Sequence, residues 1–296
     1  MKIYITIAAL FLVSCTIAQK NIEVPTFETV QVDTNPHDYI TITIDKKGQM
    51  TLEREKIKLS ALRAKIFELL YDGIKHNIGL QPLFMTELVV DKDLPYTKLA
   101  SVLSELRKMN ALPVLFACKS DTHQRIPRRK TTGFQYKLPS DENAVSVVET
   151  VFKKIESEKK NKSNDTEEAG MIPPPPPPPP SISREYIKAN PEKTESKVIV
   201  VNHQSFSIDN EEMSASQLTE KFMQWNSKKK VAYILEPTKS ATYQDVVTPI
   251  AHLLTTLKTI RNKESINLYG KAYDNLDYHK QLEVREKVPF MIVLGE

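Results

Sequence analysis

The chain has little glycine, with seven glycines among its 296 residues. Loops that cradle phosphate groups need several glycines close together, because only glycine lets the backbone approach a phosphate so closely. The scarcity of glycine therefore argues against a nucleotide-binding enzyme.

Cysteine is almost absent, since Cys15 and Cys118 are the only two in the sequence. Cys15 lies near the N-terminal apolar segment and is either lipidated or removed with it, so that Cys118 remains as a single thiol. No internal disulfide is then expected. The apolar residues around Cys118 predict a buried and unreactive side chain.

An excess of one charge is also missing, because 41 basic residues face 37 acidic ones and the formal net charge is +4. Such a balance predicts no nucleic-acid partner. The six histidines lack the spacing of metal ligands, paired cysteines are absent, and no Gly-x-Ser-x-Gly motif of a serine hydrolase occurs. We therefore expect no metal, no cofactor and no enzymatic activity.

A long apolar run is lacking as well. Residues 3–13 are apolar apart from Thr6 and follow Lys2, which is typical of a signal peptide and short for a membrane span. Residues 1–18 therefore predict export, by one of two routes. Residues 12–15 resemble a lipobox that would place a lipid anchor on Cys15, whereas residues 16–18 suit an ordinary signal peptidase.

The remaining chain divides into two units around a linker. Residues 19–39 form a polar lead-in, residues 40–139 a first unit, residues 140–196 a disordered linker, and residues 197–296 a second unit. The linker contains eight consecutive prolines, Pro173–Pro180, which predict a polyproline II segment. Such a segment is a spacer or, alternatively, a ligand for an aromatic groove.

The first unit shows the order β-β-α-β-α-β. Strict alternation predicts a strand over residues 40–44, with a return strand over 49–52. Ser60 is a candidate N-cap for a helix that ends near residues 72–73. A buried strand over 83–90 and a helix with an apolar stripe from Tyr96 to Met109 follow. Residues 113–117 form the next strand, and residues 134–138 are a candidate fifth strand.

The second unit repeats this order. Strands are predicted over residues 197–201 and 206–208, and the capping box Ser214-Ala215-Ser216-Gln217 opens a helix. A buried strand over 231–235 precedes a helix that Pro249 either kinks or delays to Thr248. Residues 266–269 and 289–294 are late strands. The fold class is therefore α+β, with two small units that each combine a mixed sheet of four to five strands with two helices.

Residues 88–117 resemble the periplasmic domain of the ExbD/TolR family. In that family a strand ends in an aspartate, a tyrosine opens the next helix, and a final strand follows. Asp91 and Tyr96 match this motif. In the second unit Tyr243 matches, but Thr238 stands in place of the aspartate, unless a longer loop lets Glu236 replace it. The resemblance covers residues 40–118 and, more loosely, 197–294, and it makes Asp91, Tyr96 and Tyr243 candidate binding residues.

The resemblance implies a non-enzymatic, membrane-associated accessory of biopolymer transport in the bacterial periplasm. Members of the family carry a transmembrane helix with an aspartate that takes part in proton flow. Here the first acidic residue is Glu23, beyond the apolar segment. A segment without a titratable group cannot relay protons, so we expect only the periplasmic module and not the motor function.

Three functions remain open on this basis. The first is a binding and scaffolding protein of the cell envelope, whose sheet edges could accept a strand from a protein partner. The second is a peptidoglycan-binding protein, and the third is an envelope hydrolase that uses carboxylates. We expect Asp91 and Asp93 to cap the following helix rather than to act as acid and base. Because the family's domains work as dimers, the two units could pair within the chain; a homodimer is the alternative.

Overall fold

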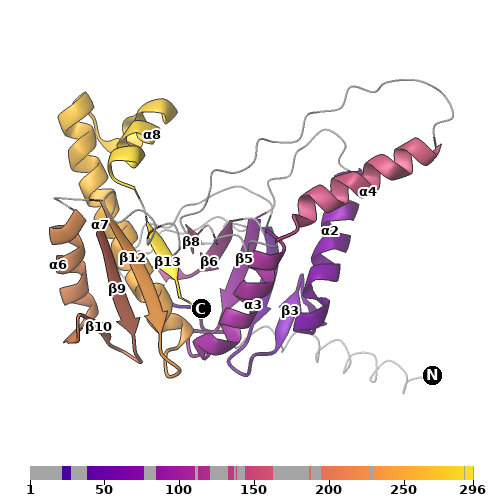
Figure 1. Ribbon diagram of the computed structural model, residues 1–296, viewed down its shortest axis with the longest axis horizontal. Helices are drawn as coiled ribbons and strands as arrows, with labels where there is room; N and C mark the ends of the chain where they lie inside the picture. Colours follow the sequence, from indigo (N-terminus) through magenta and orange to yellow (C-terminus); the bar gives the residue numbers. More distant parts are fainter. Residues whose placement is uncertain are drawn as a thin grey trace, which may run out of the picture.

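The computed structural model describes residues 22–27, 39–76, 85–110, 113–120, 133–136, 138, 144–162, 187, 195–226, 230–289 and 291–295. Within these ranges the chain forms two mixed sheets and six α-helices, which confirms an α+β fold with two units. Figure 1 shows the units side by side, the first in indigo to magenta and the second in orange to yellow. Cys15 and the polyproline run lie outside the described residues.

The first sheet has the strand order β4-β3-β2-β5-β6-β8. The central strands β2, β5 and β6 run parallel, and β3, β4 and β8 are antiparallel to their neighbours. The strand β8 confirms the candidate fifth strand, whereas β4 was not predicted. The bounds are β2 Tyr39–Ile44, β3 Met50–Leu52, β4 Glu55–Ile57, β5 Met85–Val90, β6 Val114–Ala117 and β8 Gly133–Tyr136.

Three helices accompany this sheet: α2 (Leu62–His76), α3 (Tyr96–Lys108) and α4 (Val147–Lys162). The apolar stripe of α3 is buried as predicted. Ser60 as N-cap of α2 was wrong, because it lies inside the short 3₁₀ turn η1 (Leu59–Ala61).

The predicted end of α2 at residues 72–73 was also wrong, because the helix continues to His76. Ile74 packs against the core beyond the glycine, so tertiary contacts outweigh the low helix propensity of Gly73. The helix α4 lies entirely within residues 140–196, which were assigned to the linker. Its Glu158 accepts a hydrogen bond from the Tyr71 hydroxyl on α2, which joins the two helices.

The second sheet has the order β11-β10-β9-β12-β13. Its strands β9, β12 and β13 are parallel, and β10 and β11 are antiparallel to their neighbours. This order and these directions repeat β4-β3-β2-β5-β6 of the first sheet, as a duplicated unit requires. The bounds are β9 Glu195–Val201, β10 Phe206–Ile208, β11 Glu211–Met213, β12 Val231–Pro237 and β13 Ile292–Leu294.

The second unit has the helices α6 (Ala215–Asn226), α7 (Tyr243–Tyr269) and α8 (Tyr278–Lys287), with a 3₁₀ turn η2 (Tyr273–Asn275) before α8. The predicted capping box of α6 is confirmed, because the N–H of Ser214 donates to Gln217 and the N–H of Gln217 to the Ser214 hydroxyl. The helix α7 begins at Tyr243, as the tyrosine of the motif predicts, which excludes the alternative start at Thr248. The strand predicted over residues 266–269 was wrong, because these residues belong to α7.

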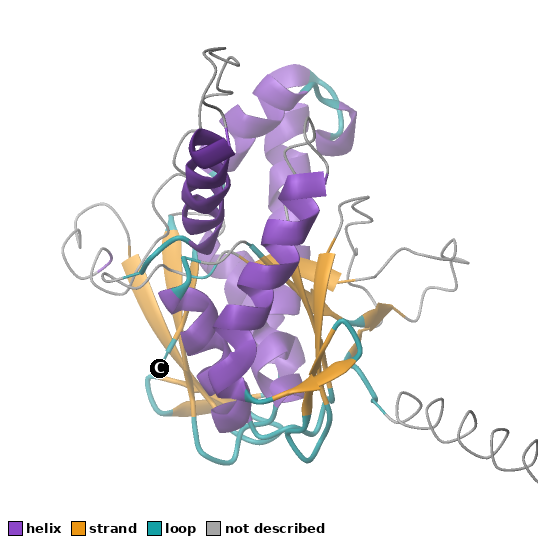
Figure 2. Ribbon diagram, turned by 90° about the vertical axis from the view of Figure 1, so that its right-hand side faces the viewer, coloured by secondary structure: helices purple, strands orange, loops and turns teal. Residues whose placement is uncertain are grey.

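The end of α7 and the helix α8 form an insertion that the first unit lacks, since only residues 109–113 separate α3 from β6. Figure 2 shows helices extending beyond the strands at one end of the molecule. Between the sheets and helices, one apolar core cluster contains residues of both units, including Phe116 and Tyr243. In the part of the chain that the structure describes, no helix combines the length and apolarity that a membrane crossing requires.

Candidate functional site at the junction of the two units

The loop after the central strand has the same backbone geometry in both units. The N–H of Asp91 donates to the carbonyl of Ile44 at 2.9 Å, and the N–H of Thr238 donates to that of Val201, also at 2.9 Å. Thr238 therefore occupies the position of the motif aspartate. Glu236 does not replace it, because it lies within β12.

These two loops bind each other reciprocally. The N–H of Tyr96 donates to the carbonyl of Ala241 at 2.9 Å, and the N–H of Tyr243 donates to the carbonyl of Leu94 at 2.8 Å. First-turn N–H groups of a helix have no partner within the helix. Each unit thus supplies an acceptor for the first residue of the other unit's helix, and the two candidate tyrosines lie at one junction.

The Tyr96 side chain is buried at this junction. Its hydroxyl lies 3.4 Å from the carbonyl oxygen of Gly295, which makes a long hydrogen bond between the start of α3 and the C-terminal end of the second unit. Burial raises the pKa of Tyr96 far above its ordinary value, and the nearby Arg107 opposes this only weakly. The phenol therefore stays neutral at physiological pH.

Tyr243 is 0% exposed, and its ring centroid lies 6.1 Å from that of Phe116 in the first unit. Among the described residues its hydroxyl has no hydrogen-bond partner. Burial, with a smaller contribution from Cys118, raises the pKa of Tyr243 well above its ordinary value. An unpaired buried hydroxyl lowers the stability of the folded protein, so Tyr243 is a costly residue at the centre of the junction.

Tyr136 on β8 is a third junction tyrosine, which sequence reasoning missed. Its hydroxyl donates to the carbonyl of Ile292 at 3.1 Å and accepts the N–H of Leu294 at 3.3 Å. Both groups belong to the outer edge of β13, which pairs with no strand of the described residues. The alternation of Phe134 and Tyr136 could have indicated a buried face, but it could not have identified a contact with the other unit.

Asp91 is 3% exposed and contacts the N-terminal segment. Its Oδ1 accepts the N–H of Asp93 at 3.1 Å, and its Oδ2 accepts the N–H of Glu23 at 3.4 Å. The expectation that Asp91 and Asp93 cap α3 was wrong, because Pro95 is the N-cap residue and no side chain bonds to the first turn there. In the described residues no hydrogen bond joins Asp91 to either motif tyrosine.

The N-terminal segment runs beside this loop as a short strand. The strand β1 (Thr26–Phe27) pairs in parallel with β7 (Lys119–Ser120), just after β6. Lys92 adds an ion pair with Glu23 at 2.7 Å. The chain that arrives from the N-terminus is therefore fastened to the motif loop of the first unit.

The second unit has its own buried carboxylate, Asp245, which forms a capping box with Thr242 at the start of α7. Its Oδ1 accepts the N–H of Gln204 at 3.0 Å, and its Oδ2 lies 3.1 Å from Nδ1 of His203. Burial opposes ionisation, but the hydrogen bonds from Thr242, Gln204 and His203 outweigh it and lower the pKa of Asp245. Asp245 thus ties the turn between β9 and β10 to α7.

In the first unit Lys98 on α3 occupies the position of Asp245 and links its helix to the turn between β2 and β3. Its Nζ donates to the carbonyl of Lys47 at 2.8 Å, so a positive side chain makes this link where the second unit uses a negative one.

No group of three or more potential metal ligands occurs among the residues that the structure describes. Cys118 is buried, as predicted, and burial raises the pKa of its thiol to about 12. The junction therefore joins the two units through buried neutral phenols and paired backbone groups.

Comparison with known proteins bears on the first unit. Residues 3–120 match the family described as biopolymer transport protein ExbD/TolR. This confirms the resemblance over those residues. The ExbD/TolR match includes the N-terminal apolar segment and extends through β7. It does not reach the second unit, whose kinship with the first rests on strand order and loop geometry. No curated protein and no solved structure gave a significant match to the chain.

Proposed function

We propose that this chain is a non-enzymatic binding and scaffolding component of the bacterial cell envelope, in which two ExbD/TolR-like units form one paired module. The family match supports a role related to biopolymer transport in the envelope. The observation that carries the proposal is the reciprocal hydrogen bonding of Tyr96 and Tyr243 across the junction. It gives a single chain the pairing that the family achieves with two.

Pairing within one chain does not depend on protein concentration, because the linker keeps each unit close to the other. The contacts that stabilise it are apolar as well as polar. The rings of Phe116 and Tyr243 meet across the junction, and Tyr136 satisfies the outer edge of β13. We therefore expect the mature protein to be a compact monomer in solution.

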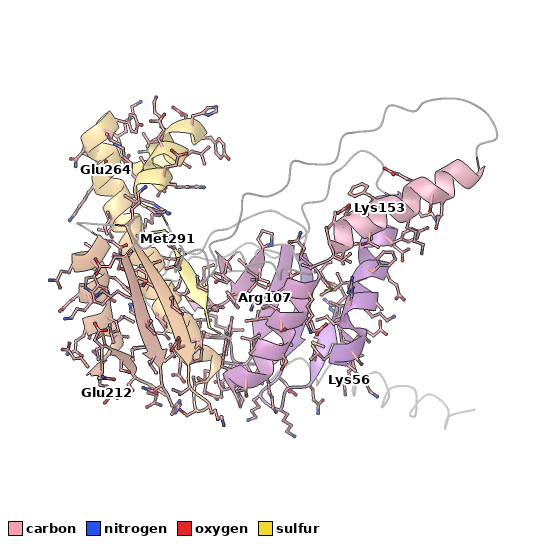
Figure 3. The ribbon with its side chains drawn as sticks, in the orientation of Figure 1. Lys56, Arg107, Lys153, Glu212, Glu264 and Met291 are labelled. Carbon is pink, nitrogen blue, oxygen red and sulfur yellow. The ribbon has the colours of Figure 1, made fainter. Side chains whose placement is uncertain are left out.

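A protein partner would bind at the outer strands of the two sheets. Among the described residues β4 and β11 each pair with one strand, so each offers an edge to an added strand. Both edges are charged, with Glu55 and Lys56 on β4 and Glu211 and Glu212 on β11. Figure 3 labels Lys56 and Glu212 in the two units. The acidic edge of β11 favours a basic extended segment.

Export and a lipid anchor at Cys15 are part of the proposal and rest on the sequence of residues 1–18. Because Glu23 binds the Asp91 loop and β1 pairs with β7, an anchor at Cys15 would hold the first unit close to the membrane. Mass spectrometry of the mature N-terminus tests this. A lipid-modified Cys15 indicates a tethered accessory, whereas a start at Gln19 indicates a soluble periplasmic protein.

Site-specific cross-linking in cells tests the binding role. A photoreactive residue at Glu212 should cross-link a discrete protein, whereas the same residue at the exposed Lys153 on α4 should not (Figure 3). Equal cross-linking at both positions would contradict an edge-binding function. Co-sedimentation with purified peptidoglycan distinguishes a cell-wall binder.

The hydrolase alternative is tested with Asp91. Its carboxylate already accepts two backbone N–H groups, which supports a structural role. We expect the purified protein to leave cell-wall fragments intact. Cleavage that disappears in Asp91→Asn while the fold is retained would favour the enzyme.

A further inference from the structure

The second sheet has an apolar face opposite the main core. Side chains alternate along a strand, so residues next to core residues point to the other face. Ile199, Tyr233 and Leu235 belong to the main core. Their neighbours Ala232 and Ile234 belong instead to a separate buried cluster with Met291 and Val293. Figure 3 labels Met291 at the start of the last strand of the second unit.

The first sheet does not have this property at the matching positions. Val198, Ile234 and Val293 lie side by side across β9, β12 and β13. The equivalent row in the first sheet is Thr41, Glu87 and Leu115.

Thr41 and Glu87 form a polar pair in that row, because the Thr41 hydroxyl donates to the Glu87 carboxylate at 2.8 Å. Two polar positions are thus replaced by Val198 and Ile234. This row is therefore entirely apolar in the second sheet and partly polar in the first, and its exposure to water would be unfavourable in the second unit.

The remaining member of the second cluster is Ile187, which comes from the stretch expected to be a free linker. Its side chain is 3% exposed and packs with Ala232, Ile234, Met291 and Val293. Isoleucine in a free linker would remain in water, whereas burial of an aliphatic side chain against other apolar side chains is favourable. Val198 next to this cluster is 38% exposed, so Ile187 covers the face only in part.

We propose that this apolar face of the second sheet is a docking site for an aliphatic side chain, and that its occupant is the chain's own Ile187. This contact fastens the C-terminal part of the linker to the second unit. The connection between the last residue of α4, Lys162, and the first contact with the second unit, at Ile187, is then shorter than the predicted linker of residues 140–196. The inference rests on the packing of the second unit and is independent of the proposed binding function.

A shorter connection between the two units strengthens their pairing. The entropy cost of closing a loop rises with its length, and the effective concentration of one unit near the other rises as the linker shortens towards the distance it must span. Docking of Ile187 thus shortens the connection and favours contact between the two units at their junction.

Limited proteolysis of the mature full chain tests the proposal. Trypsin cuts after Lys188, next to the docked residue, and an endoproteinase specific for glutamate cuts after Glu167 and Glu168. We expect Ile187→Ala to accelerate cleavage after Lys188 about tenfold, because proteolysis follows the population of the undocked segment. Cleavage after the two glutamates should not change.

Ile182→Ala is the matched control, since it removes the same side chain from a position shortly before Ile187. It should leave the cleavage rate after Lys188 unaltered. A second readout is the binding of a hydrophobic fluorescent dye, which should increase in Ile187→Asp while far-ultraviolet circular dichroism stays the same. If Ile187→Ala and Ile182→Ala accelerate cleavage after Lys188 equally, or Ile187→Asp gives no increase in dye binding, the proposal is overturned.

Discussion

Pro95 and Thr242 lie opposite each other as an antiparallel pair, the one such bridge outside the named strands of the described residues. They precede the first residues of α3 and α7, so the N-cap position of each helix faces that of the other. The two crossing N–H bonds of Tyr96 and Tyr243 flank this pair on either side. Pro95 and Thr242 therefore form a non-hydrogen-bonded antiparallel pair. In such pairs the Cα atoms lie about 4.5 Å apart.

This spacing predicts a disulfide. The double variant Pro95→Cys/Thr242→Cys should form an intrachain bond under mild oxidation, because Cα atoms about 4.4–6.8 Å apart suit a disulfide. Non-reducing electrophoresis should show a faster-migrating monomer that reverts on reduction. Either single variant should show no such band, since Cys118 is buried. A double variant that forms only intermolecular dimers would contradict pairing within the chain.

Two conservative substitutions at the junction should have different effects. Tyr136→Phe leaves the buried carbonyl of Ile292 and N–H of Leu294 without their partner and should lower the free energy of unfolding by about 1–3 kcal/mol. Tyr243→Phe removes a hydroxyl that has no partner in the described residues, so stability should stay equal or rise by about 1 kcal/mol. Urea unfolding of both variants measures this, and equal losses would refute the assignment.

The stability of the second unit should depend on Asp245 in a defined pH range. Its folded-state pKa is below the ordinary 3.8, so its contribution is fully present above that value and disappears as pH falls through the folded pKa. Asp245→Asn should cost about 1–3 kcal/mol at pH 7. Wild type and variant should converge in strong acid. Parallel unfolding curves from pH 7 to pH 2, with an unchanging gap, would be the contrary result.

The Cys118 thiol should be inert in the folded protein. Burial raises its pKa to about 12, so almost no thiolate exists at pH 8. A chain that begins at residue 22 contains no other cysteine. A thiol reagent should therefore react with it only after denaturant is added. Rapid reaction under native conditions would show that the segment around Cys118 opens easily.

The sequence predicted the fold best where local pattern and tertiary burial agree. The stripe from Tyr96 to Leu106 is helical and buried because its period matches the face that it packs. Ile266 and Leu268 show the opposite case. Their alternation suggested a strand, but they lie on α7 and are 50% and 41% exposed. The helix begins at the Thr242 capping box and ends at Gly270 with φ of 66°, and those signals at its ends outweigh a short apolar alternation.

The candidate site was predictable only in part. The resemblance identified Tyr96 and Tyr243 as candidates, but their meeting depends on contacts between residues far apart in the sequence. Asp91 was misread for the same reason. Its spacing from α3 indicated a helix cap, whereas its carboxylate binds the N–H of Glu23, which local spacing cannot reveal. Tyr136 bonds to the last strand of the chain and had no local signal of this role at all.

Two similar but non-identical units within one chain are also free of a constraint that symmetric assemblies obey. A homodimer displays each side chain twice, so its two halves offer identical surfaces to anything that approaches. Here Asp91 corresponds to Thr238, and Lys98 corresponds to Asp245. The α7–α8 insertion stands on one unit alone. A ligand that contacts both units can therefore bind in one orientation and with one copy per chain. The two ends of the paired module are thus not equivalent.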